Sequence, residues 1–215
     1  MSSRRVTFYH SPNTRSSGAL TLLHELGADY DLVEINMKAG EQRKPAYLAI
    51  NPMGKVPAIV HDGALIAEQV AVFIYLADLW VEARLAPAVS GDPLRGPYLR
   101  WMAMYGSSFE PAVIDRAMKR DPAPQSTSTY GDYDTLMKVL DDQLSKGPWI
   151  LGERFTAADV LWGGGLAWTT AFKLVPETPA IMDYVRRFTA RASAVKVKEF
   201  DAAMAERHAA AAGQG

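Results

Sequence analysis

The sequence predicts an α+β protein, with a small mixed sheet covered by helices in its amino-terminal part and an all-α bundle after it. Two observations predict this class. Residues 5–80 alternate between runs with a strand period and runs with a helix period, whereas no convincing strand pattern follows residue 81. Residues 86–97 are rich in proline and glycine, a composition typical of a linker. We therefore expect a domain at residues 1–82, a linker at 83–92 and an all-α domain at 93–215.

The amino-terminal patterns follow the order β-α-β-α-β-β-α. Residues 6–10 are β-prone, and apolar side chains at helical spacing over 13–26 end at Gly27, a residue type that closes many helices. Residues 30–35 predict a second strand, and residues 43–50 predict a short helix between two prolines. Because a β-α-β unit needs a crossover connection, its two strands are expected to run parallel.

Residues 51–69 (NPMGKVPAIVHDGALIAEQ) predict a hairpin, because two aliphatic runs flank an Asp-Gly turn. Pro57 stands at the start of the first run, where its missing N–H weakens a ladder. An X-Pro bond adopts the cis form at a cost of ~0.5–1 kcal/mol. A cis bond would turn the backbone of Val56 outward, where an extended peptide can pair by strand addition. The alternative is a trans proline that merely begins a strand.

Glu68 and Gln69 directly precede a strong helical pattern at residues 70–80. The free N–H groups and the positive dipole end of such a helix attract a carboxylate, and Glu68 beside them can hold an ammonium group. The pair therefore suits the head of an α-amino acid. The alternative is that Glu68 simply caps the helix.

The second part of the chain predicts a helix bundle, with helical patterns at residues 99–113, 130–145, 157–172, 178–191 and 194–206. Pro111 is expected to bend the end of the first helix. Thr156 and Asp159 have the form of a capping box, a structural role in which Asp159 is not a catalytic acid. The three glycines at 163–165 are unfavourable inside a helix, so we expect close packing against another helix to compensate.

Composition argues against several classes of function. A net charge of −1 provides no general attraction to nucleic acid or to an anionic membrane. The chain has no cysteine, which removes thiolate metal sites and a thiol nucleophile of its own. Its four histidines show no zinc-binding spacing, so we expect no metal. No secretory signal and no stretch long enough to span a bilayer is recognisable, and a cytoplasmic location is the expectation.

Three stretches carry a family resemblance. NPMGKVPAIVHDGALIAEQVAVFIYLAD resembles the glutathione-binding segment of the cytosolic glutathione transferases. YHSPNTRSSGALTLLHELGADYDLVEIN is similar to the first strand, active-site loop and helix of the bacterial members, and GPWILGERFTAADVLWGGGLAW to a late segment of the helical domain. They follow the family's order across nearly the whole chain. The resemblance implies a thioredoxin-like first domain, a cis Pro57 and a homodimer.

The resemblance also implies where glutathione, the co-substrate that brings the sulfur, would bind. The backbone of Val56 would pair with the cysteinyl unit beside Pro57, and Lys55 would lie near the tripeptide. Glu68 and Gln69 would hold the γ-glutamyl end. Many members have serine where this chain has Gln69, although the helix N–H groups and the amide can still donate.

The thiol-activating residue is open at this point. By offset from Gly27, Arg15 takes the place of the cysteine of one bacterial class, Asn13 falls near the serine or threonine of others, and Tyr9 matches the tyrosine of vertebrate-type classes. Ser11 and Ser16 are favoured as hydroxyl donors, Asn13 as an amide donor and Arg15 as a charge; the alternative is that these residues merely cap the first helix. The electrophile would lie between the domains, with apolar and aromatic walls. The candidate wall residues are Trp101, Met104, Tyr105, Ser108 and Phe109.

The expected function is conjugation of the glutathione thiolate to small hydrophobic electrophiles, as in cytoplasmic detoxification. Two alternatives remain, because fold does not determine activity. The first is a non-catalytic binding or interaction protein on the same scaffold. The second is a glutathione-dependent peroxidase or disulfide reductase that uses the sulfur of glutathione alone.

Overall fold

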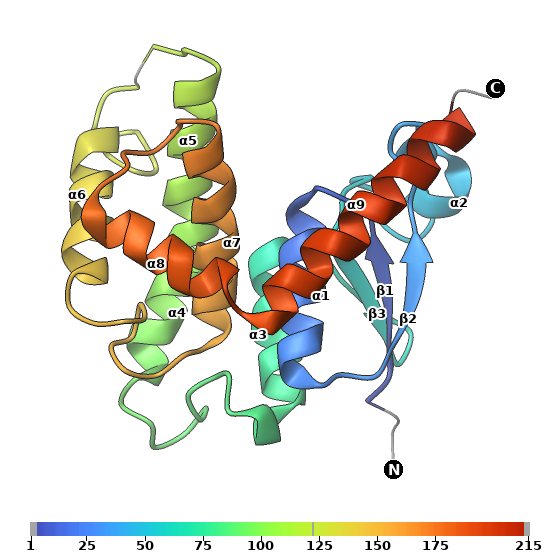
Figure 1. Ribbon diagram of the computed structural model, residues 1–215, viewed down its shortest axis with the longest axis horizontal. Helices are drawn as coiled ribbons and strands as arrows, with labels where there is room; N and C mark the ends of the chain where they lie inside the picture. The colour runs from blue at the N-terminus through green and yellow to red at the C-terminus, as the bar shows by residue number, and fades with distance from the viewer. Residues whose placement is uncertain (1–3, 122, 213–215) are drawn as a thin grey trace. The chain divides into compact units, whose positions relative to one another are not determined.

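The computed structural model describes residues 4–121 and 123–212, which form two compact units. The first unit combines the described residues up to Ala83 with those from Ala192 onward, and the second is Arg84–Arg191. Figure 1 shows the sheet and its helices in the first unit and a helix bundle in the second.

The first unit contains a four-stranded mixed sheet in the order β2-β1-β3-β4. The strands are β1 (Val6–His10), β2 (Tyr30–Glu34), β3 (Ala58–His61) and β4 (Ala64–Ile66). β1 runs parallel to β2, with Val6 opposite Tyr30, and antiparallel to β3, with Tyr9 opposite Ala58. β3 and β4 form the expected hairpin. The element order and the thioredoxin-like topology predicted from the sequence are confirmed.

The helices before residue 84 are α1 (Arg15–Leu26), η1 (Glu41–Arg43), α2 (Pro45–Leu48), α3 (Gln69–Leu79) and η2 (Val81–Ala83). α1 ends where expected, because Gly27 adopts a left-handed conformation (φ 60°) that a glycine tolerates. Apolar side chains of β1, α1 and α3 form the core of this unit. They include Val6, Phe8, Leu22, Leu23, Phe73 and Leu76, each fully buried.

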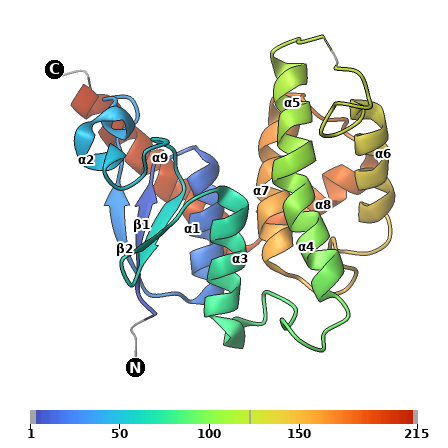
Figure 2. The same cartoon turned by 180° about the vertical axis from the view of Figure 1, so that it is seen from behind.

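The last helix, α9 (Ala192–Ala212), belongs to the sheet unit. The sequence pattern predicts it as part of the all-α domain, ending at residue 206. Figures 1 and 2 both show α9 running beside α1. The buried side chains Val197, Asp201, Met204 and His208 recur at helical spacing and define the packed face. Asn36 anchors the far end, since its Nδ2 donates to the carbonyl of His208 (3.1 Å).

The second unit is helical in its described residues. It contains α4 (Arg95–Met104), η3 (Tyr105–Phe109, one π-helical segment), α5 (Glu110–Ala117), α6 (Tyr133–Leu144), α7 (Ala157–Ala171) and α8 (Pro179–Thr189). Pro111 lies in the first turn of α5, and the chain stays helical on both sides of it. The π-helical segment directly before Pro111 and the proline itself are both features that bend helices, and the expected bend stays a prediction.

The segment expected to be a linker is attached to the helical unit. The N–H of Ala157 donates to the carbonyl of Leu85 (2.7 Å). Arg154 pairs with Asp92 (2.7 Å) and donates to the carbonyl of Ala86 (2.9 Å). These contacts fix residues 85–92 on α7 and the turn before it.

The expected capping box of α7 is confirmed, and the expected close packing is confirmed for two of its three glycines, Gly163 and Gly165. Thr156 and Asp159 form the capping box, and the Thr156 N–H donates to Oδ2 of Asp159 (2.8 Å). A Cβ on Gly163 would overlap the ring of Phe188 in α8, and one on Gly165 would overlap Tyr105 in η3. The close helix contacts therefore require glycine at these positions. No helix in the described part of the chain has the length and apolar character needed to cross a membrane.

Candidate functional site

The loop before β3 is held by a buried asparagine. Nδ2 of Asn51 (2.9 Å) and the hydroxyl of Tyr47 (2.7 Å) both donate to the carbonyl of Lys55. The side chain of Lys55 is exposed, and the following Val56-Pro57 bond is cis, as expected. The paired residues of β3 begin at Ala58, so Val56 lies beyond the ladders of the sheet.

Glu68 and Gln69 mark the start of α3, next to the loop that opens α1. Glu68 is exposed and adopts an unusual conformation (φ 65°, ψ 120°), and its side chain makes no capping hydrogen bond. Glu68 therefore occupies the N-cap position of α3, as the alternative held, but it caps through its carbonyl, which accepts from the N–H of Val72 (2.9 Å), and not through its carboxylate. Nε2 of Gln69 donates to the carbonyl of Arg15 (3.3 Å), while its Oε1 is buried and has no partner among the described residues.

The loop at residues 9–17 separates its polar side chains into exposed and buried ones. Asn13 (φ 56°) and Arg15 are exposed. Thr14 is the N-cap of α1, and its hydroxyl accepts from the N–H of Ser16 (3.2 Å). Ser11 and Ser16 are 3% and 0% exposed. Thr14, which is not among the candidate residues, is therefore the side chain that caps α1, and the two favoured hydroxyl residues lie below the surface.

The hydroxyl of Ser16 is surrounded by protein partners. It lies 2.8 Å from Nδ1 of His10, 2.7 Å from the hydroxyl of Thr14 and 3.0 Å from the carbonyl of Ser11. The N–H of Ser11 donates to the same oxygen (3.1 Å). Because a hydroxyl has one hydrogen and two lone pairs, these contacts use its capacity. Ser16 thus organises the loop from inside, which corrects the expectation that its hydroxyl faces a bound thiol.

A buried His–Asp pair continues this network and was not predicted. Nε2 of His10 lies 2.9 Å from Oδ1 of Asp201 in α9, with exposures of 0% and 3%. Burial alone would raise the pKa of Asp201, but hydrogen bonds from His10, Ser17 and the Asn13 amide outweigh it and hold that pKa below its usual value. Two sequence patterns could have indicated that these residues are buried. His10 shares a strand face with Val6 and Phe8, and Asp201 shares a helix face with Val197.

Tyr9 lies on the other face of the sheet. Neighbouring residues of a strand point to opposite faces, so the side chain of Tyr9 points away from His10. Its ring packs against Tyr47 of α2, with the centroids 5.5 Å apart. Tyr9 is therefore separated by the sheet from the α1 side of the loop, where Ser16 lies.

The five candidate wall residues of an electrophile site lie in α4 and η3. Trp101, Tyr105 and Phe109 are nearly fully buried and pack around Trp162, with centroid separations of 5.7, 5.2 and 4.9 Å. Met104 and Ser108 are half-buried. Core packing therefore accounts for the three aromatic rings.

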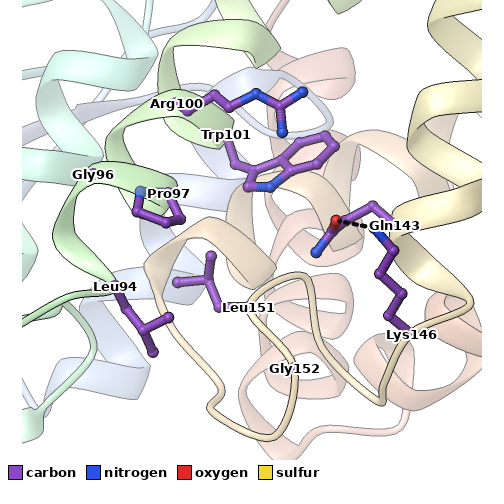
Figure 3. Close-up of a pocket in the computed structure, with 9 residues that line it drawn as sticks. All are labelled: Leu94, Gly96, Pro97, Arg100, Trp101, Gln143, Lys146, Leu151 and Gly152. Atoms are coloured by element: carbon purple, nitrogen blue, oxygen red, sulfur yellow. Dashed lines mark hydrogen bonds between the residues drawn. The ribbon is translucent and has the colours of Figure 1, made fainter.

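A cavity of about 450 Å³ opens in the helical unit (Figure 3). Trp101 lines it together with the exposed Arg100 and Lys146 and with the apolar Leu94 and Leu151. Trp101 is the member of the candidate wall set that faces this cavity. Across residues 4–121 and 123–212, no group of three or more His, Asp or Glu side chains is arranged to hold a metal ion.

Family models match both units. The glutathione S-transferase amino-terminal domain matches residues 4–78, and the glutathione S-transferase carboxy-terminal domain matches residues 116–192. Among curated proteins, the glutathione S-transferase GstA of Escherichia coli O157:H7 is 28% identical over 171 residues, covering 79% of this chain and 85% of the relative. The disulfide-bond oxidoreductase YfcG of Escherichia coli K12 is 26% identical over 201 residues, covering 86% and 91%.

Solved structures agree with this fold. A glutathione transferase from Methylococcus capsulatus superposes with a TM-score of 0.76 at 26% identity, covering 92% of this chain and 98% of that one. A glutathione transferase homologue from Sulfitobacter, solved with bound glutathione, gives 0.72 at 25% identity with the same coverage. The mixed sheet of the first unit and the helical second unit agree with the fold of these glutathione transferases. The chain belongs to the cytosolic glutathione transferase family.

Proposed function

We propose that the protein binds glutathione on its first unit and transfers the thiolate to small hydrophobic electrophiles. One observation carries the proposal. The hydrogen bond from Gln69 to the carbonyl of Arg15 joins the start of α3 to the loop that opens α1. Glu68, whose carboxylate is proposed to bind an ammonium group, therefore lies next to that loop. A ligand held by one of these segments lies within reach of the other. The Sulfitobacter homologue with bound glutathione supports this choice of ligand.

The γ-glutamyl end of glutathione carries an ammonium and a carboxylate on one carbon. In this proposal the ammonium pairs with Glu68, whose carboxylate is exposed and makes no capping bond. The γ-glutamyl carboxylate accepts hydrogen bonds from the N–H groups at the start of α3, and Gln69 lies beside it. The backbone of Val56, beyond the ladder of β3, pairs with the cysteinyl unit, and exposed Lys55 lies near the tripeptide.

The thiol must be ionised to attack. A free thiol has a pKa of about 8.5, and lowering it by about two units requires ~2.7 kcal/mol of preferential thiolate stabilisation. The exposed Asn13 and Arg15, together with the N-terminus of α1, are the proposed sources. Ser11 and Ser16 support them from below, since both are buried.

Disulfide reduction is the second candidate function, and the similarity to YfcG favours it. The chain has no cysteine, so both electrons would come from glutathione. One thiolate attacks a disulfide sulfur and displaces a thiol, and a second glutathione resolves the mixed disulfide. The products are oxidised glutathione and two thiols.

Calorimetric titration with glutathione, followed by three turnover assays, separates these functions. The assays use an aryl halide, an organic hydroperoxide and a small dialkyl disulfide. Thioether formation with the aryl halide supports the proposal, and turnover of the disulfide alone supports the second function. Binding without any turnover indicates a non-catalytic protein, and no heat at millimolar glutathione contradicts all three.

Glu68→Gln tests the ammonium contact. Loss of the charge should weaken glutathione binding by about tenfold, the size of one charge-assisted hydrogen bond. Glu199→Gln on α9 is the control, because that carboxylate is exposed and lies outside the proposed site. Equal affinities for the two variants would contradict the assigned role of Glu68.

The proposals of a homodimer and of a cytoplasmic location are checked by light scattering of the purified protein and by cell fractionation.

A further inference from the structure

We propose that Asp201, in the last helix, is the positioning residue that sets the geometry of the thiol-activating loop. The inference rests on the proposed function, because it assigns that loop its role. Asp201 lies 188 residues beyond Asn13 in sequence, and the docking of α9 beside α1 brings the two together. Its carboxylate touches the loop at three points.

Both carboxylate oxygens are used. Oδ1 accepts from Nε2 of His10 (2.9 Å). Oδ2 accepts from the backbone N–H of Asn13 (2.9 Å) and from the hydroxyl of Ser17. The loop is therefore held before, within and after its turn by one side chain that is 3% exposed.

The His10 contact extends the reach of Asp201 to Ser16. An ionised carboxylate only accepts, so Nε2 of His10 carries the hydrogen and Nδ1 faces the hydroxyl of Ser16 (2.8 Å). That hydroxyl in turn accepts from the N–H of Ser11 (3.1 Å). A continuous chain of hydrogen bonds thus runs from Asp201 to the backbone on both sides of Pro12.

The direct bond to Asn13 has the clearest consequence for the site. Asn13 has φ 56°, a left-handed conformation that asparagine tolerates better than most residues. Its side chain is exposed, and its N–H is fixed by Oδ2 of Asp201. The direction in which Asn13 presents its amide to a bound thiol therefore depends on a residue that does not itself touch the ligand.

Asp201→Asn exchanges one acceptor oxygen for an NH₂ group. On the Oδ2 side the NH₂ faces the N–H of Asn13, and on the Oδ1 side it forces the hydrogen of His10 onto Nδ1 and reverses the hydrogen bond with Ser16. We expect kcat/KM to fall by about 10–100-fold, the effect of displacing a reacting geometry by about 1 Å. The KM for glutathione should change by less than about threefold, because the groups proposed to bind its ends are untouched. The pKa of the bound thiol, followed by thiolate absorbance, should rise toward that of free glutathione.

The control is Glu199→Gln, on the same helix and exposed, which should leave all these values unchanged. Ser17→Ala is the milder variant if Asp201→Asn does not fold. It removes one of the three donors and should produce the same changes at smaller size. A purely structural role predicts a lower melting temperature with an unchanged thiol pKa in both variants, and that result would overturn the proposal.

Amide hydrogen exchange supplies a test that needs no activity. In the unmodified protein the Asn13 N–H should exchange slowly, and in Asp201→Ala, which leaves no acceptor at this point, it should exchange at the rate of an open loop. Fast exchange in the folded, unmodified protein would also refute the proposal. If glutathione neither binds nor turns over, the proposed function fails, while slow exchange at Asn13 that becomes fast in Asp201→Ala would still show that Asp201 holds the loop.

Discussion

Asp159 provides the sharpest test of how the helical unit is held together. Its buried carboxylate accepts from the N–H of Ile150 (2.7 Å), the N–H of Thr156 (2.8 Å) and the hydroxyl of Tyr184 (2.9 Å). Replacement by alanine removes the acceptor of all three donors at once. Asp159 and Tyr184 are both 0% exposed, so water does not reach the donors without a local rearrangement.

The expected loss follows from those donors. A buried donor left without a partner costs ~1–3 kcal/mol. A water molecule entering the vacated volume can satisfy one or two of them, because the new cavity has polar walls. We therefore expect Asp159→Ala to lower the free energy of unfolding by ~3–5 kcal/mol, a large part of the ~5–15 kcal/mol that holds a typical domain.

Urea unfolding followed by tryptophan fluorescence measures this loss. The ring of Trp149 lies 6.0 Å from that of Tyr184, so its emission reports on this region. Asp142→Ala on α6 is the control, because its carboxylate is exposed and pairs with Lys138 on the same helix. A loss below ~1 kcal/mol for Asp159→Ala, the worth of one ordinary hydrogen bond, would refute the reasoning.

Three further predictions concern the same unit. Burial raises the pKa of Asp159 to about 6. The folded state therefore keeps a proton that the unfolded state releases near pH 4. As the pH rises from about 4 to about 6, the free energy of unfolding of the native protein, measured relative to that of Asp159→Asn, should fall by about 3 kcal/mol. A relative free energy of unfolding that rises with pH would contradict this. In thermal unfolding, Gly163→Ala should lower the stability by ~1–3 kcal/mol, because the added Cβ overlaps Phe188. Gly164→Ala, whose nearest atoms are 4.0 Å away, should raise the stability by up to about 1 kcal/mol. A change of the same sign in both variants would show that α7 and α8 can separate. Arg154→Gln removes the guanidinium that holds Asp92 and the carbonyl of Ala86. Limited proteolysis between residues 84 and 94 should therefore become faster. An unchanged cleavage rate would show that other contacts hold the segment.

Local patterns predicted most elements well. The strand at Val6–His10, the Asp-Gly hairpin and the Thr156–Asp159 capping box all lie where the sequence places them. Each depends on interactions between residues a few positions apart, such as alternation, turn geometry or a reciprocal cap. The glycines of α7 were also interpretable, because their cost inside a helix required a close neighbour.

The candidate site was predicted in part. Pro57 and the start of α3 are local features, and the sequence located both. The roles of the serines were not predictable, because the same hydroxyl can face solvent or the core. Ser16 proved to be buried against His10, while Asn13 and Arg15 are exposed. Burial depends on which elements cover the loop, and no local pattern specifies that.

The sequence by itself determined the order of the elements and the turn and cap residues, because short-range sterics and hydrogen bonding decide these features. The cis form of Pro57 followed from the family resemblance. The tertiary structure alone decided that α9 returns to the sheet unit and that Asp201 meets His10 across 191 positions of the chain. A helix with a buried stripe can pack on any complementary apolar face. The choice among such faces is made by the packing of the whole unit, and with it the partner of every buried charge.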